Sequence, residues 1–87
     1  MSDRELLEMA AKAAGLSMRE TIAFRWNPLV DDGDALRLAV RLELFHRLNT
    51  VYQPLATIYF DATDPDPYAA TRRAIVRAAA EIGRSKT

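Results

Sequence analysis

The first pattern of apolar and polar positions along the chain is helical. Apolar residues recur at spacings of three and four through residues 3–14. Ser2 and Glu5 have the Ser-x-x-Glu spacing of a capping box, and Gly15 stands where a helix commonly ends. The sequence therefore predicts a helix over residues 3–14.

The pattern then changes to a period of two. Between residues 18 and 26, the large apolar residues Ile22, Phe24 and Trp26 alternate with Thr21, Ala23 and Arg25, which is typical of a half-buried strand. The residue before Pro28 is restricted to extended geometry, and the proline itself ends the strand. Residues 18–26 are predicted to form the first strand.

A turn and a second helix follow. Residues 31–34 read Asp-Asp-Gly-Asp, which predicts a turn with one aspartate capping the next helix. Helical spacing over residues 34–42 then predicts that helix. Its apolar stripe consists of Ala35, Leu38, Ala39 and Leu42.

Residues 43–61 return to a strand-like pattern. In residues 44–48, Leu44, His46 and Leu48 alternate with Phe45 and Arg47. A second alternation covers residues 56–61, where Thr, Ile, Tyr and Phe are frequent. Pro54 keeps the intervening residues out of a central strand. We expect an antiparallel hairpin here.

The last predicted element is a helix that begins at Asp66 and Pro67. Aspartate as N-cap with proline at the first helical position is a strong start signal, and Gly83 is expected to end the helix. The element order α-β-α-β-β-α predicts an α+β fold, a single domain over residues 1–87. A small three-stranded, largely antiparallel sheet is packed by three helices in this prediction.

Composition excludes several classes of function. The chain has no cysteine, which removes disulfides and thiolate metal sites and fits a cytoplasmic location. The formal net charge is zero, which argues against nucleic-acid binding. No apolar run is long enough for a membrane span, and no signal peptide is apparent. A small core without disulfides or a metal site often gains stability by self-association. We therefore expect a homodimer that pairs through the edge strand 18–26.

Two groups invite a catalytic or metal-binding interpretation. The spacing of Asp31, Asp32 and Asp34 does not match a calcium-binding loop, so a turn with a helix cap is the favoured interpretation. His46 is the only histidine and lacks a recognisable nucleophile motif, so it is interpreted as a strand residue. We expect no enzyme activity, no cofactor and no bound metal.

Four residues are candidate binding residues. Arg72, Arg73 and Arg77 form the one basic concentration, which is either a solvated helix face or a site for phosphates or an acidic partner. Trp26 is interpreted as a plug in the core or in a dimer interface. If Trp26 is exposed, it is a binding hot spot instead.

Three segments carry a resemblance to a known group. They are 26–40 (Trp-Asn-Pro-Leu-Val-Asp-Asp-Gly-Asp-Ala-Leu-Arg-Leu-Ala-Val), 66–83 (beginning Asp-Pro-Tyr-Ala-Ala-Thr-Arg-Arg) and 3–15. The chain resembles small, mostly uncharacterised phage and prophage proteins of Proteobacteria and is loosely similar to the NinX-like phage family. Those proteins carry a longer segment where this chain has residues 16–25, so a site in that segment would be remodelled here. The resemblance implies no enzyme activity and no catalytic residues.

Two functional hypotheses follow. The first is a phage-encoded, non-catalytic interaction protein that binds and inhibits a host protein. The expected target is an antiviral defence complex, as for an anti-CRISPR. The alternative is a protein that sequesters a small molecule or nucleotide signal, with Arg72, Arg73 and Arg77 lining a pocket at an oligomer interface. DNA binding through the last helix is a third option, which the zero net charge disfavours.

Overall fold

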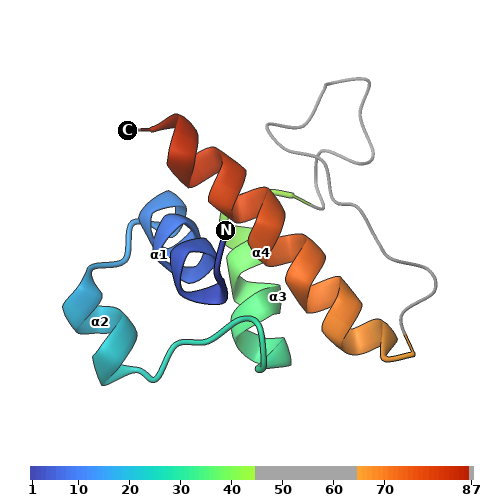
Figure 1. The fold of residues 1–87 in the computed structure, drawn as a ribbon. Coiled ribbons are helices and arrows are strands. Elements are labelled where there is room, and N and C mark those ends of the chain that lie inside the picture. The colour runs from blue at the N-terminus through green and yellow to red at the C-terminus, as the bar shows by residue number, and fades with distance from the viewer. Residues whose placement is uncertain (45–64, 87) are drawn as a thin grey trace.

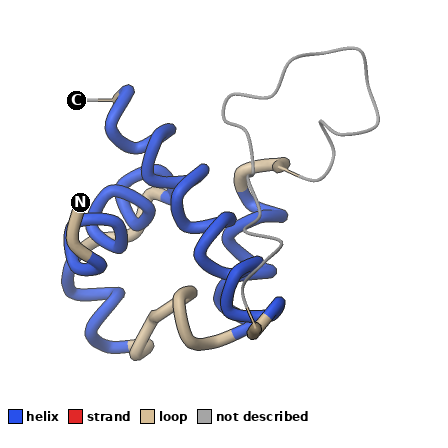
Figure 2. Tube along the Cα trace, turned by 45° about the vertical axis from the view of Figure 1, so that its right-hand side comes forward, coloured by secondary structure: helices blue, strands red, loops and turns tan. Residues whose placement is uncertain are grey.

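The described part of the chain is helical. A computed structural model describes residues 1–44 and 65–86, and these residues form four helices and no strand (Figure 2). The predicted α+β fold with a three-stranded sheet is therefore wrong. The helices are α1 (Asp3–Ala14), α2 (Met18–Ala23), α3 (Asp32–Arg41) and α4 (Pro67–Ser85).

The first helix has the predicted bounds. The Ser2 side chain accepts a hydrogen bond from the Glu5 backbone, and the Glu5 carboxylate accepts one from the Ser2 backbone. Gly15 ends α1 in the left-handed region at φ 75°. Both ends of α1 are thus fixed by local hydrogen bonds that the sequence alone specifies.

The predicted first strand is instead the short helix α2, followed by a turn at residues 24–25. A second capping box begins α2, because Ser17 accepts from the Glu20 backbone and Glu20 accepts from the Ser17 backbone. Met18 and Ile22 are four residues apart, a spacing that fits a strand face and a helix face equally well. The cap decides between the two structures locally, and no residue of α2 is buried.

The third helix begins two residues earlier than predicted. Asp31 caps α3 by accepting from the Asp34 backbone at 2.7 Å, so Gly33 lies within the first helical turn. Glu43 and Leu44, which were predicted to open the next strand, form a turn after α3. The remainder of the predicted hairpin, with His46, lies outside the described residues.

The longest helix, α4, packs mainly against α1 and also against α3 (Figure 1). Asp66 caps α4 and Pro67 occupies its first turn, as predicted. Gly83 does not end the helix, which continues to Ser85. A Cβ atom on Gly83 would lie 1.9 Å from the Met9 carbonyl oxygen, so this glycine allows close approach of α1 and α4.

Small side chains make this close packing possible. The core contains buried alanines from three helices, together with larger side chains that include Leu38, Leu44 and Val76. Alanine at a helix contact lets the two backbones approach, so α1, α3 and α4 each bury an apolar face. No helix in the described residues is long and apolar enough to cross a membrane.

Candidate functional site

A groove in the described surface lies between α1 and α2. It has a volume of about 550 Å³, within the range of ligand-binding clefts. We call it the α1–α2 groove. It is lined by Arg4, Leu7, Glu8, Ala11, Lys12, Leu16, Met18, Thr21, Ile22 and Trp26.

The chain reversals that follow α1 and α2 bring Leu16 and Trp26 into the groove. Each reversal pairs a left-handed residue with an apolar residue directly after it. After α1, Gly15 is left-handed and the Leu16 N–H donates to Ala11 O at 2.9 Å. After α2, Arg25 has φ 52° and the Trp26 N–H donates to Thr21 O at 2.9 Å.

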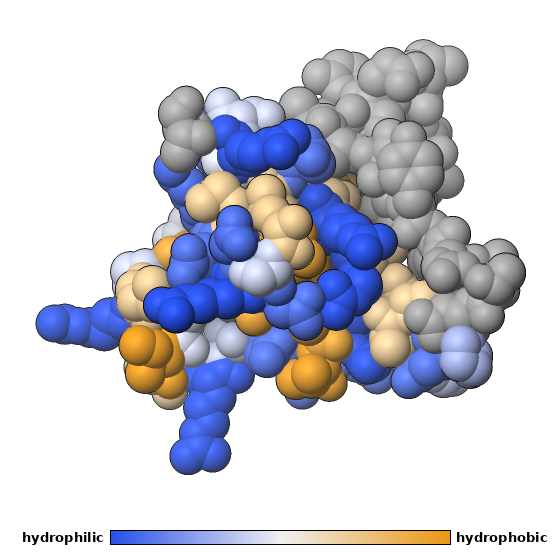
Figure 3. Space-filling view, viewed as in Figure 1, coloured by the Kyte–Doolittle hydropathy of each residue, from blue (hydrophilic) through white to orange (hydrophobic). Residues whose placement is uncertain are grey.

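Trp26 is neither a fully buried plug nor a fully exposed hot spot. Its ring is partly buried, packs against the core cluster and also lines the groove. On α2, Met18 is 61% exposed and Ile22 is 71% exposed. Figure 3 shows hydrophobic and hydrophilic side chains next to one another in this part of the surface. Most of the surface of Met18 and Ile22 is therefore accessible to a ligand in the groove.

Charged residues of α1 line the same groove. Arg4 Nε lies 3.2 Å from the Glu8 carboxylate, so these two charges neutralise each other. Lys12 is exposed and makes no ion pair or hydrogen bond through its side chain with any described residue. One uncompensated positive charge therefore lies at the end of the groove nearest the α1 C-terminus.

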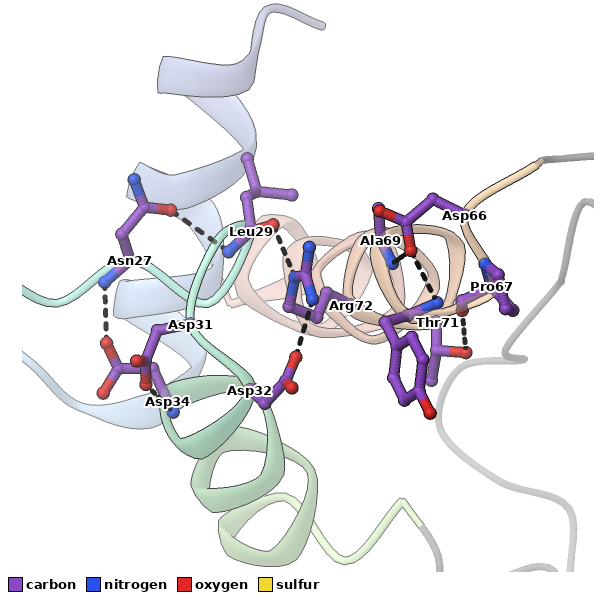
Figure 4. A network of polar contacts seen from close by, with 11 residues as sticks. Asn27, Leu29, Asp31, Asp32, Asp34, Asp66, Pro67, Ala69, Thr71 and Arg72 are labelled. Atoms are coloured by element: carbon purple, nitrogen blue, oxygen red, sulfur yellow. Dashed lines mark hydrogen bonds and ion pairs between the residues drawn. The ribbon is translucent and has the colours of Figure 1, made fainter.

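The structure places the candidate arginines of α4 away from the groove. Arg72 donates from Nε to Leu29 O at 2.9 Å and from a terminal nitrogen to Asp32 at 2.6 Å (Figure 4). Arg73 forms a two-point hydrogen-bonded ion pair with Asp3 at 2.9 and 3.1 Å. Two of the three arginines thus hold α4 to other elements.

Arg77 differs from its two neighbours. It is exposed, and its side chain makes no hydrogen bond or ion pair with a described residue. The three arginines consequently do not form one ligand-binding cluster.

The aspartates of the turn at residues 31–34 all make contacts that stabilise the fold. Asp31 caps α3, and Asp32 pairs with Arg72. Asp34 accepts from the Asn27 backbone at 2.9 Å (Figure 4). It also accepts from the Arg37 side chain at 2.7 Å. Among the described residues, no group of acidic or histidine side chains is arranged to hold a metal ion.

The Asp3–Arg73 pair makes stability depend on pH. The hydrogen bond from Arg73 lowers the pKa of the Asp3 carboxyl. Its contribution is therefore complete above the unfolded pKa of about 4 and is lost as pH falls through the lowered value. We expect Asp3→Asn to reduce the melting temperature at pH 6 and to have a smaller effect near pH 3. Thermal unfolding of both proteins across this range measures the difference, and a difference independent of pH would contradict the prediction.

The sequence pattern identified Trp26 as a candidate binding residue but did not identify the other residues of the groove. Met18 and Ile22 were assigned to a strand, and Leu7, Ala11 and Lys12 were treated only as helix residues. The Ser-x-x-Glu spacing at Ser17, the same as at Ser2, was the available signal for α2.

Comparison with family models, with curated proteins and with solved structures found no match to this chain. The resemblance to phage proteins therefore stays a prediction. Function is inferred from the groove and from the charges around it.

Proposed function

We propose that this chain is a non-catalytic interaction protein that binds a partner protein in the α1–α2 groove. The observation that carries the proposal is the position of Met18 and Ile22, which are exposed on a helix with no buried residue. Together with half-buried Trp26 they leave an apolar surface uncovered at one corner. Tryptophan and neighbouring aliphatic side chains are typical anchors of protein interfaces.

Burial of this surface is large enough to matter for binding. Full burial of one Met or Ile side chain is worth about 1.5–3 kcal/mol, and most of the area of Met18 and Ile22 is still accessible. Covering both contributes about 2–4 kcal/mol, to which coverage of Trp26 adds. These three side chains therefore form a hot spot. Its burial alone does not supply enough free energy for stable binding, so a partner must also make contacts outside the groove.

The biological setting of the proposal comes from the sequence. The resemblance of residues 26–40 and 66–83 to phage and prophage proteins favours a phage-encoded inhibitor of a host factor. A small protein without a catalytic motif inhibits a host factor by occupying its surface. We propose an antiviral defence component as that host factor. The alternative of nucleotide-signal sequestration rested on the arginines of α4, and no observation favours it, because Arg72 and Arg73 are held by carboxylates of the chain itself.

A matched pair of variants tests the proposed surface. Ile22→Ser removes an apolar side chain from the groove, whereas Leu36→Ser removes one of 56% exposure from α3, outside the groove. We expect affinity capture from host lysate to recover one stoichiometric partner with the wild type and with Leu36→Ser. Recovery with Ile22→Ser should fall about tenfold, the equivalent of about 1.4 kcal/mol.

The same pair serves in a functional assay. Expression of the wild type should restore plaque formation by a phage that the host defence restricts, and Ile22→Ser should restore it less than Leu36→Ser. Equal capture of a partner by both variants would move the interface away from the groove. Absence of any stoichiometric partner would overturn the proposed function.

A further inference from the structure

The α1–α2 groove is lined by residues of two helices, and this inference rests on the function proposed for it. On one side, Leu7 and Ala11 are four residues apart on α1; on the other, Met18 and Ile22 are four residues apart on α2. Residues four apart on a helix form a ridge, and the groove between two ridges accepts the ridge of a third helix. An amphipathic helix laid into an apolar groove is a recurring mode of recognition.

The charges along the groove favour helices of one charge over helices of the other. Glu8 is neutralised by Arg4, whereas Lys12 has no carboxylate partner among the described residues. Lys12 also suits the carbonyl end of α1, an interaction that leaves its ammonium group in water and accessible. A ligand that carries a carboxylate beside its apolar face therefore gains an ion pair that a basic ligand cannot make.

We propose that the α1–α2 groove binds an amphipathic helix of a partner protein whose apolar face is flanked by acidic residues. The apolar residues of that helix contact Met18, Ile22 and Trp26, and one of its carboxylates pairs with Lys12. The apolar contact supplies most of the affinity. The ion pair sets the preference for an acidic flank and the orientation of the helix.

Trp26 provides the signal for the test, since it is the only tryptophan in the chain and lines the groove. The probes are two designed helical peptides without tryptophan or tyrosine. They share an apolar face of leucines and isoleucines at helical spacing and carry either glutamates or lysines on the flanks. Titration of the intact protein with each peptide is followed by Trp26 emission.

We expect a saturable change of Trp26 emission with the glutamate peptide and about fivefold weaker binding of the lysine peptide at low salt. The preference should diminish at about 0.5 M salt, where exposed ion pairs are screened. Lys12→Glu should reverse the preference. Arg77→Glu is the matched control, an exposed cation outside the groove, and should retain it. Circular dichroism establishes that both variants are helical.

Three results would overturn the inference, and they differ in what they say of the proposed function. Equal binding of the two peptides would remove the acidic preference and leave the groove as an interaction site. No saturable change with either peptide would remove helix binding, and the capture experiment with Ile22→Ser would then decide the proposed function separately. Trp26 emission that changes with protein concentration alone, with a doubled solution mass, would identify a second copy of this chain as the occupant.

Discussion

Replacing Gly83 with alanine is expected to lower the free energy of unfolding by about 3 kcal/mol, at the upper end of the cost of overpacking. The added Cβ atom would lie 1.9 Å from the carbonyl oxygen and 2.8 Å from the carbonyl carbon of Met9. These are backbone atoms, so neither can move without displacing α1 from α4. The gain in helix propensity from glycine to alanine, about 1 kcal/mol, is too small to offset the clash.

The consequence is measurable by thermal unfolding. A loss of this size lowers the melting temperature of a domain of this length by roughly 10–20 °C. Gly33→Ala is the matched control, because its Cβ would meet only side-chain atoms of Arg37 and Asp31, at 3.2 Å. That variant should stay within about 1 kcal/mol of the wild type. If the two variants were equally stable, the close contact of α1 with α4 would be wrong.

Arg72→Gln is expected to cost about 2 kcal/mol of stability, because the Leu29 carbonyl oxygen and the Asp32 carboxylate both lose their donor. The Arg72 side chain is only 17% exposed, so water replaces these hydrogen bonds poorly. Asp32 is 71% exposed, and Asp32→Asn should therefore cost clearly less than Arg72→Gln. Urea unfolding of the two variants gives the comparison.

Arg77→Gln separates a structural role from a ligand-binding role on the same helix. Arg77 is exposed and its side chain makes no hydrogen bond or ion pair with a described residue, so its substitution should change stability by less than about 0.5 kcal/mol. A similar loss for Arg77→Gln and Arg72→Gln would contradict the assignment of Arg72 as the residue that joins α4 to the loop before α3.

The structural use of Arg72 changes the interpretation of the segment Trp26–Val40. Its aspartates cap α3, hold the Asn27 backbone and pair with Arg72, so most of its polar groups stabilise the fold. Only Trp26, at the start of the segment, reaches the α1–α2 groove. This segment thus positions the candidate site and contributes one side chain to it.

Helices whose ends are closed by nearby residues could be predicted from the sequence. The bounds of α1 follow from its capping box and from Gly15, and the start of α4 follows from Asp66 and Pro67. The period-two interpretation of residues 18–26 failed because Met18, Ile22 and Trp26 are also spaced at intervals of four. A six-residue helix with no buried face leaves little hydrophobic pattern by which to recognise it.

The sequence by itself determined the caps, the turns and the apolar faces of α1, α3 and α4, because these depend on residues within a few positions of one another. Only the tertiary structure decided where Arg72 and Gly83 act, since their partners lie 40 or more positions away in the sequence. It also decided that Leu7 of α1 and Ile22 of α2 line one groove with Trp26. A groove exists only when separate elements pack side by side, and local patterns of apolar and polar residues do not specify that packing.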